Sequence, residues 1–355
     1  SSVFKPKFSG KYILKILADD GYRMIFNGKE MFSDWSQHAV TQKETVVTVE
    51  AGKEYPIVIE YYEEIGGASM KFEYARLLEE KLDSKLKRVQ NVILCVGFNH
   101  KLEFEDADRP FELPQYQLDL IDRMSKEKKN VIVIVNAGGG VEMASWKDKV
   151  QGIIMAWYPG QQGGQALAEI VSGKISPSGK LPISIEKKAE DNPTFGSYVD
   201  ANPKSVHKRV QYNEGVFLGY KGYDKSGIEP LYPFGFGLSY TNFEYSNLKV
   251  AKTGGNNVVV SYTIKNIGKY DASEISQVYV GDVTVSVPRP QKELKGFDKV
   301  FLKKGESKEI RIELKEDAFA FFDVNTDKFV IEPGEFKILV GASAKDIRLN
   351  QTVVL

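Results

Sequence analysis

The chain lacks most features that would tie it to a membrane, a polyanion or a disulfide framework. Its 355 residues include one cysteine, Cys95, so no internal disulfide can form. The 48 basic and 48 acidic residues balance, and this predicts no nucleic-acid partner. No apolar run approaches the roughly 20 residues that span a bilayer, so we expect no membrane span. Cys95 lies in the apolar run 92–96, which favours a buried strand thiol.

Metal and nucleotide signatures are also missing. The three histidines, His38, His100 and His207, are scattered and lack the spacing of a metal site. The glycine run 138–140 follows an apolar run, but no Gly-x-Gly-x-x-Gly motif opens a helix there and no Lys-Ser/Thr pair follows. The sequence therefore predicts no metal ion and no cofactor.

The first residues, Ser-Ser-Val-Phe, contain neither a methionine nor a charged-then-apolar leader. This beginning fits a leader that has been removed or that lies upstream. We expect a periplasmic or secreted location rather than a cytoplasmic one.

Residues 1–78 have the pattern of a β domain. Runs of period two at 11–17 and 45–50 are separated by turn pairs such as Asp20-Gly21 and Asn27-Gly28. We expect strands and tight turns throughout this part.

Residues 79–240 change to a pattern typical of an α/β domain. The charged segment 77–88 has helical leucine spacing, and we expect a surface connector or short helix there. Apolar runs that we expect to be buried on both faces alternate with helix candidates: the runs are 91–97, 130–136 and 152–157, and the helices are 115–124 and 164–171. This order predicts βαβ units in an open, mostly parallel sheet, whose ligands gather at the carboxyl ends of the strands. Residues 190–240 are rich in Gly, Pro, Asn and aromatics without periodicity, which predicts a long ordered loop region.

Residues 241–355 return to strands. Period-two runs separated by turn residues lie at 257–264, 276–281, 307–314 and 334–341. They predict a β-sandwich of the fibronectin type III or immunoglobulin kind. The whole chain is thus expected to be a multidomain α/β plus all-β protein, in which an open, mostly parallel α/β sandwich is flanked by an N-terminal β domain and a C-terminal β-sandwich.

An acidic loop follows the first expected α/β strand. This loop, residues 98–109, carries four carboxylates and an arginine: Glu103, Glu105, Asp106, Asp108 and Arg109. A carboxylate that lies beside other acids and is partly desolvated can stay protonated near neutral pH, which a general acid requires. Arg109 could instead hold Asp108 ionised and fix the loop. The residues alone leave both a catalytic loop and a solvated surface loop open.

Several long stretches resemble glycoside hydrolase family 3. The stretch that begins Trp157-Tyr-Pro-Gly-Gln-Gln-Gly-Gly and ends at Pro182 resembles the signature of the second domain of that family. So do 212–224 and 229–240, while 289–300 resembles its C-terminal fibronectin-like domain. Residues 9–35 resemble the β domain named for the anthrax protective antigen, which some members carry inserted in the second domain. The resemblance thus covers nearly the whole chain.

The resemblance implies a role for one glutamate of the acidic loop. The acid/base glutamate of the family stands three residues before an Asp-Arg pair, typically within Glu-Gly-Tyr-Asp-Arg. The matching stretch here is Glu105-Asp-Ala-Asp-Arg109, in which Asp106 and Ala107 depart from the motif. This match makes Glu105 the expected acid/base, with Asp108 and Arg109 as the supporting pair and Glu103 as the runner-up.

The resemblance also implies the reaction. The expected function is that of a retaining, exo-acting β-glycosidase, first a β-glucosidase, which removes terminal β-D-glucosyl residues from β-glucosides or β-linked oligosaccharides by double displacement. In this family the nucleophilic aspartate and most sugar-binding residues lie in a (β/α)₈ barrel, and the sequence lacks the eight strand-helix repeats and roughly 250 residues of one. We therefore expect a C-terminal portion that is inactive without the barrel portion of the same enzyme.

Two other functions stay open. A non-catalytic carbohydrate-binding or adhesion module would bind sugar without a barrel. A β-xylosidase of the same family would look the same here, because the glycone pocket lies mostly in the barrel.

Two further features bear on sugar binding. Ser33-Asp34-Trp35 looks like the nucleophile motif of the family, but it falls inside the expected β domain, and we interpret Asp34 as structural. Aromatic side chains that could stack on sugar faces are Tyr158, Phe195, Tyr198, Tyr212 and Tyr223.

Overall fold

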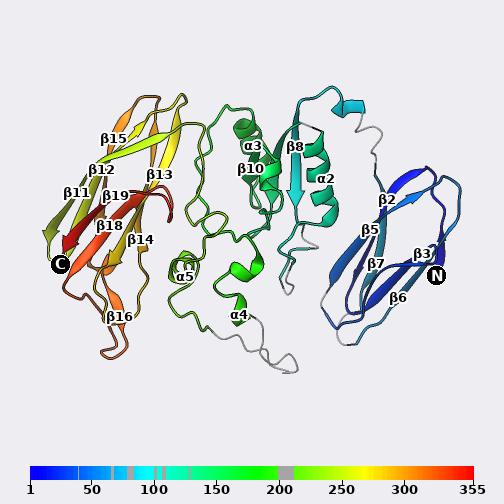
Figure 1. The fold of residues 1–355 in the computed structure, drawn as a ribbon, viewed down its shortest axis with the longest axis horizontal. Helices are drawn as coiled ribbons and strands as arrows, with labels where there is room; N and C mark the ends of the chain where they lie inside the picture. Colours follow the sequence, from blue (N-terminus) through cyan, green and yellow to red (C-terminus); the bar gives the residue numbers. More distant parts are fainter. Residues whose placement is uncertain are drawn as a thin grey trace. The chain divides into compact units, whose positions relative to one another are not determined.

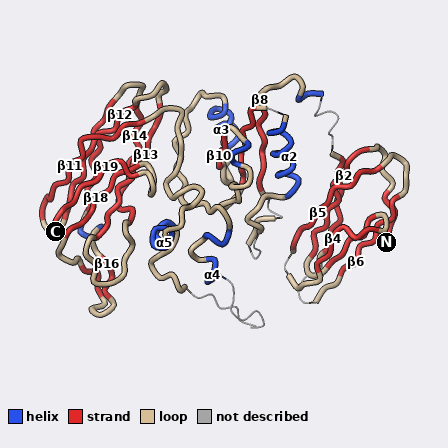
Figure 2. The backbone as a smooth tube through the Cα atoms, in the orientation of Figure 1, coloured by secondary structure: helices blue, strands red, loops and turns tan. Residues whose placement is uncertain are grey.

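The computed structural model describes residues 1–38, 40–64, 68–77, 84–99, 102–105, 109–127, 129–198 and 212–355. The chain divides into two compact units, residues 1–138 with 146–157, and residues 139–145 with 158–355. Figure 1 labels most helices and strands of both units, and Figure 2 separates helix, strand and loop by colour. No helix in the described ranges is long and apolar enough to cross a bilayer.

The N-terminal part of the first unit contains two antiparallel sheets. Tyr22, Met24, Leu14 and Ile16 have no exposed surface and form part of a single core. One sheet has the order β1-β6-β3-β4, made of Ser2–Phe4, Tyr55–Tyr61, Tyr22–Phe26 and Lys29–Asp34, and the other has the order β5-β2-β7, made of Thr41–Val49, Gly10–Ala18 and Met70–Arg76. The predicted strands and turns are therefore present, while the resemblance to the protective-antigen domain stays a prediction.

The hairpin between β3 and β4 shows how the sequence directs this part of the chain. Phe26 pairs with Lys29, and the two residues between them, Asn27 and Gly28, have φ of 50° and 77°. Two successive residues with positive φ are what a type I′ hairpin turn needs, and Asn-Gly is the pair that adopts them most readily. The predicted turn signal is thus used as a turn.

A three-stranded parallel sheet forms the remainder of the first unit. Its order is β10-β9-β8, made of Gly152–Met155, Asn130–Asn136 and Asn91–Gly97. Helix α2, Gln115–Lys126, packs on β8 and β9 and buries Ile121 and Met124. The βαβ order predicted from the apolar runs is confirmed.

Strand β8 differs from the prediction in its burial. Cys95 is exposed and Ile93 is 49% exposed, so the predicted burial of the thiol is wrong. The reason is that β8 is an edge strand of the described sheet, and alternate residues of a strand point to opposite faces. A continuous apolar run predicted burial on both faces, but only the central strand β9 approaches that state, because it buries Val133 and Val135 on one face and Ile134 on the other.

The second unit begins with α3, Gly163–Val171, and continues through a long stretch of mostly irregular chain. The stretch contains only short helices among the described residues, such as α4, Phe195–Tyr198, and α5, Tyr220–Ser226. A lone antiparallel bridge joins Ile185 to Tyr232. This irregular chain agrees with the loop region predicted for 190–240.

The C-terminal part of the second unit is a β-sandwich (Figure 1). The core of the sandwich includes five residues with no exposed surface: Val258, Val260, Ile264, Leu302 and Val340. One sheet has the order β11-β12-β15, made of Phe243–Gly254, Asn257–Asn266 and Ser307–Leu314, and the other has the order β14-β13-β18-β19, made of Glu293–Leu302, Ala272–Asp282, Glu335–Gly341 and Ile347–Val354. A small hairpin, β16 with β17, spans Phe321–Asp323 and Lys328–Val330. The predicted fold class is confirmed.

Candidate functional site

The acidic loop leaves the parallel sheet where β8 ends. Gly97 pairs with Asn136 at the end of β9, so the loops after both strands begin at the same edge of the sheet. Gly97 has φ of 135°, and an added Cβ would lie 1.9 Å from the carbonyl oxygen of Asn136. Only glycine allows the two strand ends to approach this closely.

A glutamine from α2 holds the same point. The Gln117 side chain accepts a hydrogen bond from the Gly97 N–H through Oε1 at 2.8 Å and donates one from Nε2 to the Gly97 carbonyl at 2.9 Å. Gln117 is 8% exposed. Both backbone polar groups of Gly97 are thus paired where the acidic loop starts.

Glu103 has both carboxylate oxygens occupied. Oε1 accepts from Arg109 Nε at 2.7 Å, and Oε2 accepts from the backbone N–H of Gly138 at 2.9 Å. Arg109 also donates from Nη1 to the carbonyl of Pro110 at 3.0 Å, and its guanidinium lies 4.4 Å from the ring centre of Phe98. Glu103 therefore serves as an acceptor for groups of the protein itself.

Glu105 differs from Glu103 in every one of these respects. Its side chain is exposed, and it makes no hydrogen bond or ion pair with the part of the chain that the structure describes. Asp106 and Asp108 lie outside the described residues, so the predicted pairing of Asp108 with Arg109 stays a prediction. The structure brings Glu103 and Arg109 together and leaves Glu105 open to a ligand.

Asp34 has the contacts of a structural residue. It accepts hydrogen bonds from the backbone N–H and the hydroxyl of Ser36, and it lies 3.2 Å from Lys43 Nζ. Although partial burial acts to raise it, the bonds from Ser36 and Lys43 hold the pKa of Asp34 below its ordinary value. His100 and His207 lie outside the described residues, and within those residues no group of three or more His, Cys, Asp and Glu side chains could hold a metal ion.

The aromatic residues that we considered for sugar stacking divide into two classes. Tyr212, Tyr158 and Phe195 are 81%, 52% and 44% exposed. Tyr223 is 2% exposed and therefore cannot stack on a sugar: α5 turns this side chain inward, and burial raises the pKa of its phenol. The side chain of Tyr198 lies outside what the structure describes.

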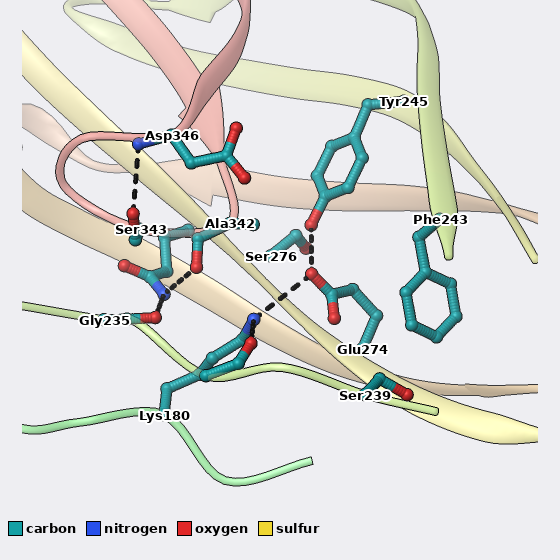
Figure 3. Close-up of polar contacts among 12 residues, drawn as sticks. Lys180, Gly235, Ser239, Phe243, Tyr245, Glu274, Ser276, Ala342, Ser343 and Asp346 are labelled. Carbon is teal, nitrogen blue, oxygen red and sulfur yellow. Dashed lines mark hydrogen bonds and ion pairs between the residues drawn. The ribbon is translucent and has the colours of Figure 1, made fainter. Parts of the chain in front are cut away.

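A second charged cluster lies in the other unit, and it is closed to solvent. Lys180 and Glu274 lie 3.4 Å apart with 10% and 6% of their side chains exposed, and Tyr245 donates to Glu274 at 2.8 Å (Figure 3). Lys180 also donates to the carbonyl of Gly237 at 3.0 Å. We call Lys180, Tyr245 and Glu274 the buried polar cluster; its contacts join Lys180 and Gly237 to the C-terminal sandwich.

Gln117 and Gly138 were not predicted from the sequence. Gln117 stands four residues before Ile121 and seven before Met124, on the buried stripe of α2. A lone polar residue on such a stripe signals a specific hydrogen bond, because an unpaired buried amide is costly. The contact with Gly138 is made by its backbone, which leaves no signal in the side-chain sequence.

Two family profiles match the chain. The profile described as "Glycosyl hydrolase family 3 C-terminal domain" matches residues 26–220. The profile described as "Fibronectin type III-like domain" matches residues 274–344. Together they cover the α/β part and most of the C-terminal sandwich.

Curated relatives and solved structures agree with these matches. The chain is 40% identical over 284 residues to thermostable β-glucosidase B of Acetivibrio thermocellus. The alignment covers 78% of this chain and 37% of that protein. It is also 40% identical over 279 residues to an exo-α-(1→6)-L-arabinopyranosidase of Bifidobacterium breve; this alignment covers 78% of this chain and 36% of that protein. The structure of β-glucosidase from Kluyveromyces marxianus in complex with glucose matches 99% of this chain and 44% of its own, with 30% identity and a TM-score of 0.75. The chain thus spans less than half the length of these relatives.

Proposed function

The chain belongs to glycoside hydrolase family 3, and from this premise we propose that it is the C-terminal portion of a retaining, exo-acting β-glycosidase, most specifically a β-glucosidase. The observation that carries the proposal is the position of Glu105. This carboxylate is exposed and unpaired within the described residues, in a loop at the carboxyl edge of a parallel sheet, where ligands of open α/β sheets bind.

In the proposed mechanism Glu105 is the acid/base. It first donates its proton to the departing glycosidic oxygen and then removes a proton from the water that hydrolyses the glycosyl-enzyme intermediate. The partner carboxylate must lie about 5–5.5 Å away and attack the anomeric carbon. We assign that nucleophile, together with most of the glycone pocket, to a barrel portion of the same longer enzyme. The two steps need proton transfer and displacement only, so no cofactor enters.

We also propose three domains. Residues 1–78 form the protective-antigen-like β domain, 79–240 the family's α/β sandwich domain, and 241–355 the fibronectin type III-like domain. The observed strands support these limits, because β7 ends at Arg76 and β11 begins at Phe243.

The test is an assay of the chain on an aryl β-glucoside, first alone and then with the barrel portion added. The proposal predicts no turnover by the chain alone and turnover on addition. The matched control is the Glu105→Ala chain with the same barrel portion. Appreciable hydrolysis by the isolated chain would refute the assignment of the nucleophile to a separate portion.

The glycone needs its own comparison, because one relative at 40% identity is named an arabinopyranosidase. The same assay with aryl β-glucoside, β-xyloside and α-L-arabinopyranoside ranks the three. If the enzyme is a β-glucosidase, kcat/KM should be highest for the β-glucoside. Sugar binding without any hydrolysis, in the presence of the barrel portion, would instead indicate a carbohydrate-binding module.

A further inference from the structure

Glu103 and Arg109 flank Glu105 in the sequence and meet in space. Glu103 stands two residues before Glu105 and Arg109 four residues after it, and their side chains join at 2.7 Å. The side chains are only 20% and 12% exposed, so water screens this pair less than an open surface pair. The ion pair therefore closes the loop across its two ends.

Arg109 is itself held in one orientation. Its guanidinium lies over the Phe98 ring at 4.4 Å and donates from Nη1 to the Pro110 carbonyl at 3.0 Å. A planar guanidinium that is stacked and hydrogen-bonded on separate edges presents Nε in a fixed direction. The partner that Nε meets in that direction is Glu103.

The second oxygen of Glu103 reaches a different loop. It accepts from the N–H of Gly138 at 2.9 Å, and Gly138 follows β9, next to the end of β8. The start of the acidic loop is fixed separately, by the two hydrogen bonds between Gln117 and Gly97. Glu105 thus lies on a short stretch of chain that is fastened on both sides while its own carboxylate stays open.

From this geometry we infer that Glu103 is a positioning residue for Glu105, acting through a staple made of the Glu103 carboxylate, the Arg109 guanidinium and the Gly138 N–H. The inference rests on the proposed role of Glu105. It removes Glu103 from the candidates for proton transfer, because both of its oxygens already accept hydrogen bonds from the protein. A displacement of about 1 Å at a catalytic group can cost on the order of 100-fold in rate. The staple limits such displacement.

The first test is the leaving-group dependence of Glu103→Gln in the enzyme that carries the barrel portion. We expect kcat/KM for an alkyl β-glucoside to fall roughly 10–100-fold, because departure of an alkoxide needs a well-placed acid. For 2,4-dinitrophenyl β-glucoside, whose leaving group needs no proton, we expect a change below about threefold. Arg109→Lys should likewise lower kcat/KM for the alkyl glucoside and not for the 2,4-dinitrophenyl glucoside. The double variant Glu103→Gln with Arg109→Lys should lose no more kcat/KM than the worse single variant, since both residues act through one contact.

The matched control is Glu169→Gln. Glu169 is also a mostly buried carboxylate, 19% exposed, that accepts from Lys174 at 2.6 Å and from Gln165 at 2.7 Å, but it lies on α3 outside the acidic loop. This variant should leave kcat/KM unchanged for both substrates. An equal loss of kcat/KM on both substrates in Glu103→Gln would mean general damage to the fold and would overturn the inference. Formation of β-glucosyl azide by Glu103→Ala in the presence of azide would also overturn it, because that product would mark Glu103 as the acid/base.

A second readout separates the staple from the proposed activity. In hydrogen-exchange measurements on the chain itself, the Gly138 amide should exchange at least about tenfold faster in Glu103→Ala, which leaves no side-chain acceptor for it, than in the wild type, and Glu169→Ala should not change it. A wild-type enzyme without turnover on any glycoside, but with this exchange result, refutes the proposed function and leaves the staple standing. Unchanged exchange of Gly138 refutes the staple, whatever the activity.

Discussion

Glu105 of the acidic loop and Glu274 of the buried polar cluster are in opposite states. Glu274 is 5% exposed and accepts from Lys180 and Tyr245 (Figure 3). Glu105 is exposed and has no partner within the described residues. A buried carboxylate that accepts from a lysine and a tyrosine can contribute to stability but cannot meet a substrate. An exposed carboxylate on a fastened loop contributes little to stability and is free to transfer a proton. The comparison therefore separates groups that hold the fold from the group that we propose carries the chemistry.

The largest effect is expected from Glu105→Ala in the enzyme that carries the barrel portion. Loss of a general acid should lower kcat/KM for an alkyl β-glucoside about 1000-fold, which corresponds to about 4 kcal/mol of barrier. The free energy of unfolding should change by less than about 0.5 kcal/mol, because the side chain is exposed. Steady-state kinetics and urea denaturation measure the two quantities. An unchanged rate would place the acid elsewhere.

Glu274→Ala should show the reverse, a loss of stability. Removing the carboxylate leaves Lys180 buried without its counter-charge, which should lower the free energy of unfolding by roughly 3 kcal/mol. The double variant Lys180→Met with Glu274→Ala should recover part of that loss, because no buried charge remains. Urea denaturation tests this, with the exposed Glu244→Ala as control. Equal stability of Glu274→Ala and Glu244→Ala would show that the buried polar cluster does not hold the fold.

A smaller effect should appear at alkaline pH. Burial, followed by the charge and hydrogen bond of Glu274, raises the pKa of Tyr245. The protonated phenol is then favoured in the folded state. Its contribution to the free energy of unfolding is complete below about pH 10 and decreases by about 1.4 kcal/mol per pH unit as the pH rises further. Denaturation midpoints between pH 9 and 11 should therefore fall less steeply in Tyr245→Phe than in the wild type. Parallel curves would contradict the proposed cost of ionising Tyr245.

The smallest effect is expected where a charge pair is open to water. Lys5 and Glu54 lie 3.1 Å apart, but their side chains are 59% and 63% exposed. Glu54→Gln should change the free energy of unfolding by less than about 1 kcal/mol. A loss as large as that of Glu274→Ala would mean that burial is not what distinguishes the pairs.

Most of the fold could be predicted because it follows from local pattern. Four strands of the C-terminal sandwich, β12, β13, β15 and β18, and helix α2 match their predicted ranges within a few residues, since period-two and period-3.6 spacing are properties of the chain itself. The burial of Cys95 could not be predicted, because an apolar run does not reveal whether its strand lies at an edge. The burial of Tyr223 stayed open for a similar reason, since the direction of a side chain on a short helix depends on what packs beside it.

The candidate site was predictable only in part. The motif singled out Glu105 because catalytic side chains stand at fixed sequence spacing. The state of Glu103 depends on loop conformation, which brings a residue six positions away and a backbone amide of another loop to its two oxygens. No spacing rule gives that arrangement, so Glu103 remained a rival to Glu105 until its contacts were known.

The most direct test of the account is product analysis of Glu105→Ala with 2,4-dinitrophenyl β-glucoside in the presence of azide, in the enzyme that carries the barrel portion. Without its base the variant should accumulate the glycosyl-enzyme, and azide should attack the anomeric carbon and displace the nucleophilic carboxylate. The account predicts faster turnover with azide and β-glucosyl azide as the product. Glucose as the sole product, at a rate that azide does not change, would contradict the assignment of Glu105 as the acid/base.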